Sequence, residues 1–228
     1  MPVLNPTVSN QITGTISPTF AGARDATSGT VATVSSRYTQ AIRYSRVSGP
    51  RANTYSINRY FIEFDTSGIS VTPADATLSI YGFTNGSADF FPVKATFSDG
   101  AIANGDFDAI DGWSAGADNS SNVTKYSSEV ETWSTSGFND ITLNSDALSD
   151  MVSEDNFKIC LIQSGNDLAN VEATTVVTTG IDFVNNLRLT YTEGSAGYGH
   201  KVAGVAAASI SKVKSVATAN IGKVNSVD

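Results

Sequence analysis

The chain has 228 residues, of which 16% are charged, whereas an average globular protein has about a quarter. Its formal net charge is −8, and its single Cys and single His exclude an internal disulfide and zinc sites of the usual Cys/His type. No stretch approaches about eighteen apolar residues, and residues 1–20 have neither a basic start nor an apolar run, so we expect no membrane span and no signal peptide.

Charge is segregated along the chain. Residues 24–59 contain six Arg and one acid, residues 60–193 contain four basic and twenty acidic residues, and residues 194–228 contain four Lys and one acid. The acidic middle argues against nucleic acid as a partner, because phosphates need a basic surface. The Arg-rich stretch either pairs with the acidic middle within the fold or docks onto an acidic neighbouring subunit.

The pattern of apolar residues predicts an all-β protein. Residues 1–24 are rich in Thr, Ser and Pro, which predicts an extended N-terminal arm with at most one edge strand. The body, residues 25–193, alternates apolar and polar residues between turn sequences, which favours a two-sheet antiparallel sandwich of jelly-roll type. Nine strands are predicted, at residues 30–34, 41–47, 59–64, 76–83, 91–97, 140–143, 157–163, 174–178 and 186–192.

A loop within the body carries two candidate binding sites. Asp106, Asp108 and Asp111 gather oxygen ligands of the kind that calcium prefers, but the EF-hand spacing and its closing Glu are missing, so turn formation is the alternative role. Trp113, Tyr126 and Trp133 flank this loop, either as a platform on which a glycan stacks or as ordinary core residues. Calcium is the one cofactor that the sequence suggests.

Two further features of the body concern its helix content and its chemistry. Residues 145–152 predict a short helix capped by Asn144 or Ser145. Cys160 lies in an apolar run and is expected to be a small buried hydrophobe. The only histidine, His200, follows a glycine in a linker, so a catalytic triad has no base, and we expect a protein without enzymatic activity. A polysaccharide lyase or hydrolase is the weaker alternative, because twenty acids leave a carboxylate pair open.

The tail, residues 194–228, repeats an eleven-residue unit that begins at Lys201, Lys212 and, in truncated form, Lys223. If the segment is helical, an eleven-residue period places the apolar positions on one stripe, which needs a partner to cover it. Gly204 and Gly222 weaken a helix, so an extended clamp and a solvated tail are the alternatives. The stripe consists of Val202, Val205, Ile210, Val213, Val216, Ile221, Val224 and Val227.

Two segments resemble known families. Residues 59–69, with the sequence RYFIEFDTSGI, and residues 74–81 resemble jelly-roll modules of carbohydrate-binding type in bacteria and phages. In the first segment, Asp65 and Ser67 are expected to hold the turn after the strand. Units such as ISKVKSVA, at residues 210–217, resemble the C-terminal repeats of structural proteins from tailed phages, especially marine ones.

The second resemblance implies a virion protein that is made in the cytoplasm of a host bacterium. It would serve as a capsid decoration or head-fibre component that docks onto capsid or tail subunits through its own tail, and it would form a homo-oligomer such as a trimer. The alternative is a host-attachment module that binds surface glycans. Neither role involves nucleic acid or a membrane.

Overall fold

The structure is a computed structural model that describes residues 1–32, 37–48, 53–87, 89–172 and 174–194, and the backbone of residues 212–213 and 216–217. Ten strands form one antiparallel, hydrogen-bonded assembly. They are β1 (Val3–Leu4), β2 (Val8–Gly14), β3 (Gly29–Val31), β4 (Arg37–Ser48), β5 (Asn53–Asp65), β6 (Asp75–Gly86), β7 (Phe90–Lys94), β8 (Phe138–Thr142), β9 (Asn156–Gln163) and β10 (Val177–Thr192).

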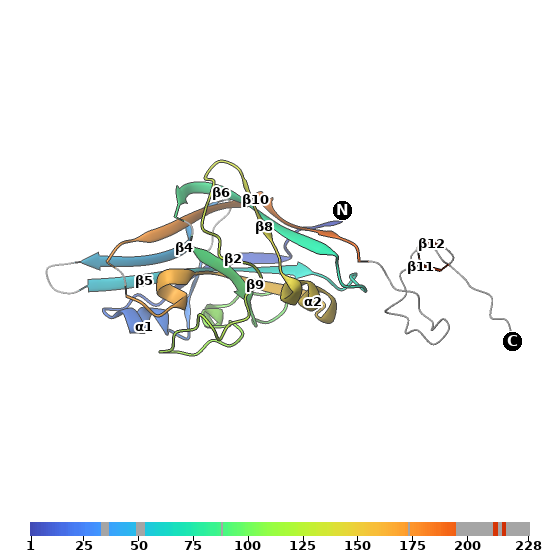
Figure 1. Cartoon of the computed structure of the whole chain (residues 1–228). Coiled ribbons are helices and arrows are strands. Elements are labelled where there is room, and N and C mark those ends of the chain that lie inside the picture. The colour runs from blue at the N-terminus through green and yellow to red at the C-terminus, as the bar shows by residue number, and fades with distance from the viewer. Residues whose placement is uncertain are drawn as a thin grey trace.

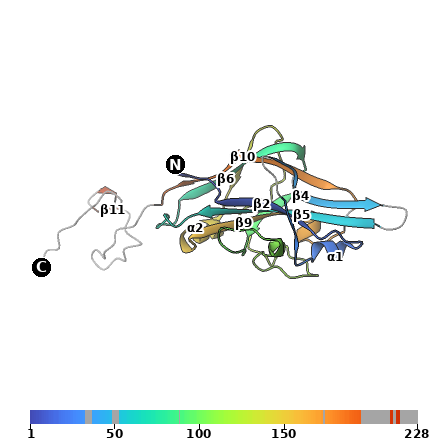
Figure 2. The same ribbon diagram turned by 180° about the vertical axis from the view of Figure 1, so that it is seen from behind.

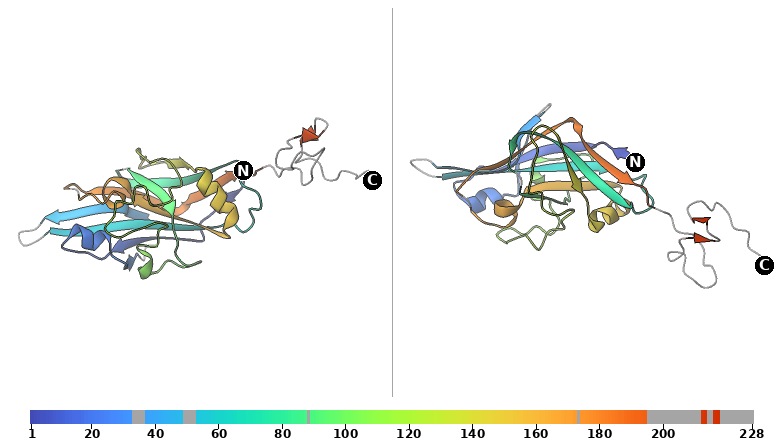
Figure 3. Two further views of the ribbon diagram at one scale, coloured as in Figure 1. Left: turned by 60° about the horizontal axis from the view of Figure 1, so that its bottom comes forward. Right: turned by 45° about the horizontal axis from the view of Figure 1, so that its top comes forward.

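The strands lie in two layers that are joined by a long hairpin. The first layer has the order β3-β2-β5-β9-β7, and the second contains β4, β10, β6 and β8, with β1 beside the end of β10. The first half of β5 pairs with β4, which joins the layers along one side (Figure 1). Figure 2 shows the first layer from behind, and Figure 3 (right) shows orange β10 beside teal β6 in the second. The predicted antiparallel β-sandwich is confirmed, and its strand order is consistent with a jelly roll.

The main core lies between the two layers. It is formed by Ile62 and Phe64 of β5, Leu78 of β6, Phe157 of β9 and Leu189 of β10, all of which are fully buried. These residues come from strands that the apolar alternation predicts. Burial of their side chains supplies the main stabilising free energy of the sandwich.

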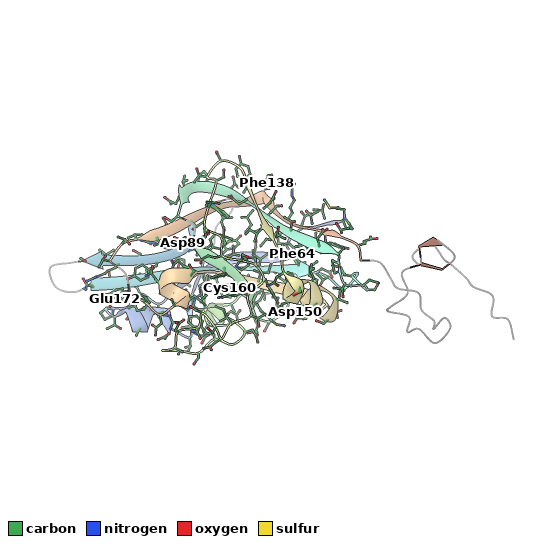
Figure 4. All side chains as sticks on the ribbon, viewed as in Figure 1. Phe64, Asp89, Phe138, Asp150, Cys160 and Glu172 are labelled. Atoms are coloured by element: carbon green, nitrogen blue, oxygen red, sulfur yellow. The ribbon has the colours of Figure 1, made fainter. Side chains whose placement is uncertain are left out.

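A second core covers the outer face of the first layer. Phe61 and Cys160, which point away from the main core, pack there with Phe107 from the long loop between β7 and β8. Both faces of β5 and β9 are therefore buried, which explains the unbroken apolar runs in these strands. Burial raises the pKa of the Cys160 thiol, as expected for a small core residue. Figure 4 shows Phe64 and Cys160 inside the body.

Two short α-helices pack on the two cores, α1 on the second core and α2 on the main core. In α1 (Phe20–Arg24), the Thr19 hydroxyl accepts a hydrogen bond from the Gly22 amide at 3.2 Å. In α2 (Ser145–Ser153), the Asn144 side chain accepts bonds from the amides of residues 146 and 147, both at 3.1 Å. Such caps satisfy amides that have no partner within the helix. The helix predicted at residues 145–152, with Asn144 as its cap, is confirmed.

The N-terminal segment differs from the predicted arm. Residues 8–14 form β2, an internal strand of the first layer that pairs with β5 on one side and β3 on the other, and β1 pairs with β10. Only Ile12 of β2 is a fully buried apolar residue. This strand is held mainly by backbone pairing, so its sequence lacks the apolar alternation that identifies a strand.

The strand predicted at residues 186–192 and the last two residues of the one predicted at 174–178 belong to a single strand, whereas residues 174–176 are not in a strand. β10 runs continuously from Val177 to Thr192, and its pairing register with β6 shifts between Asp182 and Leu187. The shift breaks the alternation in the sequence, which explains why the pattern predicts two strands. Of the strand predicted at residues 30–34, residues 33 and 34 lie outside the described part of the chain.

The turn after β5 makes stability depend on pH. The Asp65 carboxylate accepts bonds from the Ser67 hydroxyl at 2.6 Å and the Ser67 amide at 3.0 Å, as the sequence predicts, and these bonds lower its pKa. Hydrogen bonds from Lys158 and Ser120 likewise lower the pKa values of Asp99 and Asp118. A carboxyl group with a depressed pKa in the folded state stabilises it above the unfolded-state pKa.

This stabilisation is lost as the pH falls through the folded-state pKa values. We therefore expect the free energy of unfolding to decrease between about pH 5 and pH 2. Urea unfolding at a series of pH values measures this decrease. In Asp65→Asn, which lacks one of the three groups, the decrease should be smaller, and an identical pH profile would contradict the assignment to Asp65.

Candidate functional site

The repeat tail is the site that the sequence favours, and the structure describes four residues of its repeats. Lys212–Val213 (β11) pairs antiparallel with Val216–Ala217 (β12), with Val213 opposite Val216. These four residues are extended where a helix was the favoured prediction, in agreement with the strand preference of Val. The other stripe residues lie outside the described residues: Val202, Val205, Ile210, Ile221, Val224 and Val227.

Trp113, the first candidate for glycan stacking, packs against two buried guanidinium groups. Its ring centroid lies 4.5 Å from the Cζ of Arg24 and 4.1 Å from that of Arg59. Its indole Nε1 is buried and has no hydrogen-bond partner among the described residues. Because the ring is partly buried against these cations, Trp113 belongs to the second core.

Tyr126 and Trp133 have structural contacts as well. Tyr126 is fully buried, and its hydroxyl donates to the Asp150 carboxylate at 2.7 Å; burial, followed by this bond, raises its pKa. Trp133 packs edge-on against Phe90, and its Nε1 donates to the Gly180 carbonyl at 3.2 Å. Both pack on the main core, whereas Trp113 packs on the second, so the three aromatic residues do not form one platform.

The three candidate calcium ligands are used separately. The Asp106 carboxylate accepts a bond from the Ala103 amide at 2.7 Å, and that of Asp111 accepts one from the Thr124 hydroxyl at 2.9 Å. In the part of the chain that the structure describes, no group of three or more His, Cys, Asp or Glu side chains is placed to hold a metal ion. The bond of Asp106 is of the turn-forming kind, whereas Asp111 joins two parts of the loop and Asp108 lies near Arg59 as a minor source of negative charge.

A buried charge network joins the Arg-rich stretch to the acidic middle. The Arg59 guanidinium donates to both carboxylate oxygens of Asp167, at 2.7 and 2.8 Å, and all these side chains are fully buried. Burial lowers the pKa of Arg59, but the charge and hydrogen bonds of Asp167 outweigh that effect and raise it overall. The guanidinium of Arg24, also fully buried, donates to the backbone carbonyls of Asp167, Leu168 and Ala117.

This network confirms, for Arg59, that the Arg-rich stretch pairs with the acidic middle. A weaker pair joins Arg46 and Glu172 at 3.8 Å near the surface. Because each charge of a fully buried pair depends on its partner for neutralisation and hydrogen bonds, the network is a structural element of the second core.

A groove lies where the two layers part, opposite the β4–β5 hairpin. One wall is residues 139–142 of β8, the edge strand of the second layer, and the other is the loop segment 127–132. Val130 of this segment exchanges backbone hydrogen bonds with Phe90 of β7, at 2.9 and 3.4 Å, so this wall belongs to the first layer. The groove has a volume of about 410 Å³.

The groove is polar and acidic. The described residues that line it include Glu129, Glu131 and Asp140 but no Lys or Arg. Glu129 accepts a hydrogen bond from the Ser164 hydroxyl, and Asp140 accepts one from Ser79 at 2.6 Å. Both carboxylates are therefore held in place at the groove, and the Glu131 side chain is exposed beside them.

The chain matches no protein-family profile and has no significant match among curated proteins. Among the described residues, no helix is long and apolar enough to span a membrane. The candidate sites are therefore supported by the sequence and by the geometry of the structure alone.

Two of these features, the groove and the partner of Arg59, are not predictable from the sequence. The groove is made by segments that are each polar and unremarkable, and it exists only because β8 is at the edge of its layer. The acid that pairs with Arg59 is 108 residues away, in η2 (Ser164–Leu168), a π-helical turn. The Arg-rich stretch gives a signal that buried pairs exist, but nothing in the sequence selects Asp167 among twenty acids.

Proposed function

We propose that this chain is a non-enzymatic structural protein of a tailed-phage virion. It would serve as a capsid decoration or head-fibre component and dock onto other virion proteins through its C-terminal repeat tail. The observation that carries the proposal is the eleven-residue repeat from Lys201 onward, in which Val and Ile recur at fixed positions. A repeated apolar stripe that its own segment cannot cover is suited to a partner surface.

The body supports this role because its first and last residues lie at the same end of the sandwich. The Tyr191 amide near the end of β10 donates to the Pro2 carbonyl at 3.2 Å, and the Ala74 amide donates to the Thr192 carbonyl at 3.0 Å. The tail therefore begins at the end of the sandwich where the chain starts (Figure 1). A body docked by its tail would point this end toward the particle and the end with α1 away from it.

The contacts of the reactive side chains also favour a structural role. Cys160 is fully buried with a raised pKa, so its thiolate form is suppressed. Asp150, one acid of the body, binds both the Tyr126 hydroxyl and the Lys94 ammonium group. Because Trp113, Tyr126 and Trp133 serve the two cores, glycan attachment is the less favoured function.

We expect tail variants to be lost from the particle while the body stays folded. In a phage that encodes Val216→Asp with Val227→Asp, charge on the stripe should lower the amount of this protein per particle at least about tenfold, because burying an unpaired carboxylate costs more than 1.4 kcal/mol. Quantitative mass spectrometry of purified particles measures this amount. Circular dichroism shows whether the sandwich is retained.

The matched control places the same charges one residue earlier, as Ser215→Asp with Ser226→Asp. In a helix these positions face away from the stripe, and in a strand each faces away from the valine that follows it. The control should be incorporated normally. Equal incorporation of both double variants would contradict anchoring by the stripe.

A further inference from the structure

We propose that the acidic groove beside β8 binds one extended Lys-Val repeat from the tail of a second copy of this chain. The repeat would add a strand to the free edge of β8. This inference deepens the proposed function, because it rests on the tail as the docking element and names a partner for it. Three observations support the inference: the unpaired edge of β8, the charge of the groove and the composition of the tail.

The first observation is the free backbone of β8. The Leu143 amide donates a hydrogen bond to the Ala76 carbonyl of β6 at 2.9 Å. This bond identifies which residues of β8 point their backbone groups toward β6. In such a ladder, alternate residues point their N–H and C=O groups toward the same partner strand, so those of Asp140 and Thr142 point away from β6. Neither has a backbone partner among the residues that the structure describes.

The second observation is that the groove leaves space for an added strand beside this edge. The loop that forms the far wall is tied to β8 at both ends, through the Asn144 amide to the Tyr126 carbonyl at 2.8 Å and the Ser134 amide to the Asn139 side chain at 2.7 Å. Between these ties the groove opens. Residues 139–142 offer about 13 Å of edge, at about 3.3 Å per residue, which is enough for a strand of four or five residues.

The third observation is charge. Three carboxylates line the groove without a basic residue, whereas residues 194–228 carry four Lys and one acid. Each repeat begins with Lys followed by Val, and residues 212–213 and 216–217 already adopt strands. A basic, extended segment is the occupant that this groove complements in both charge and backbone conformation.

The number of repeats points to a second copy as the source. Two complete repeats and part of a third follow one body, whereas four residues of β8 match less than half of one repeat. A tail thus carries more repeats than the groove of its own body holds. Repeats that reach other copies would link bodies into an oligomer.

Crosslinking between two differently tagged full-length chains tests the proposal. One chain carries Thr142→Cys in the groove wall and the other carries Ser215→Cys in the tail, and the native Cys160 is fully buried. A short bismaleimide tolerates a slip of one residue in register. We expect a covalent heterodimer, which is lost when Ser98→Cys, exposed on a loop outside the groove, replaces Thr142→Cys.

Two further variants of the first chain test the backbone and the charge. Thr142→Pro removes a backbone amide that points away from β6, so it leaves the ladder between β8 and β6 intact. In sedimentation experiments without crosslinker, this variant should self-associate several-fold more weakly than Thr142→Ala. Glu131→Lys should lower the heterodimer yield several-fold, whereas Asp155→Lys, with the same charge change on an exposed site elsewhere, should not.

Each alternative outcome overturns the proposal. Crosslinking only within a single chain that carries both cysteines would place the repeat on its own body, and no crosslink at all would exclude the groove. If particles incorporate Thr142→Pro normally but lose the double variant Val216→Asp with Val227→Asp, the tail anchors the protein but its partner is not the groove. The proposed function would then stand and the groove proposal would fail.

Discussion

Replacing Asp167 with Asn is expected to lower the free energy of unfolding by about 3–5 kcal/mol, because it leaves buried positive charge uncompensated. Asp167 accepts both hydrogen bonds of the Arg59 fork, and Arg24 lies beside it with its Nε 3.9 Å from the same carboxylate. An Asn side chain offers one acceptor oxygen and turns an NH₂ group toward guanidinium donors. The acids that remain nearby are Asp25, which is partly exposed, and Asp108, which is a minor source of negative charge at Arg59.

Urea unfolding followed by tryptophan fluorescence measures this loss, since Trp113 stacks on both guanidinium groups. The matched control is Asp99→Asn, which removes a carboxylate that pairs with Lys158 at the surface. That variant should change stability little, because water screens an exposed pair. A loss for Asp167→Asn no larger than for Asp99→Asn would show that the buried network is not needed for stability.

The second large effect is expected in the main core. Phe157 on β9 is fully buried between the layers, and its ring lies 5.0 Å from that of Tyr126. Phe157→Ala removes most of a buried aromatic ring and leaves a cavity that the two rigid layers cannot close. We expect a loss of about 3–5 kcal/mol in the free energy of unfolding.

Phe138→Ala is the matched control for this prediction. Phe138 is 38% exposed at the surface of the second layer, where it packs edge-on against Tyr81 (Figure 4). Its removal should cost less, about 1–2 kcal/mol, because the ring is partly exposed and loses mainly its contacts with Tyr81 and with the Arg188 guanidinium, whose Cζ lies 4.3 Å from the ring centroid. Chemical unfolding followed by far-ultraviolet circular dichroism compares the two, and equal losses would contradict the assignment of Phe157 to the core between the layers.

Several elements of the fold are predictable because their signals are local. The strand predicted at residues 157–163 differs from β9 by one residue, and the helix predicted at residues 145–152 is likewise one residue short of α2. The turn at Asp65 also needs only neighbouring side chains. In these cases apolar spacing and capping chemistry act within a few residues, so one short window contains the information.

The features that the sequence predicts wrongly or leaves open depend instead on distant segments. β2 is polar, and it becomes an internal strand because β5 and β3 flank it. Tyr126 and Trp133 are equally consistent with a platform or a core when taken alone, and the layers that surround them decide between the two roles. The roles of the candidate calcium ligands depend on loop geometry in the same way, since Asp106 and Asp111 accept hydrogen bonds from two different partners.

The sequence by itself determined the all-β class, the segregation of charge and the repeat at the C-terminus, because these follow from composition and from periodic spacing along the chain. The tertiary structure alone decided which acid neutralises Arg59, which aromatic residues are buried and where an open strand edge meets acidic side chains. Each of these depends on segments tens of residues apart being brought together, and pairing between distant segments leaves no periodic trace in the sequence of either one.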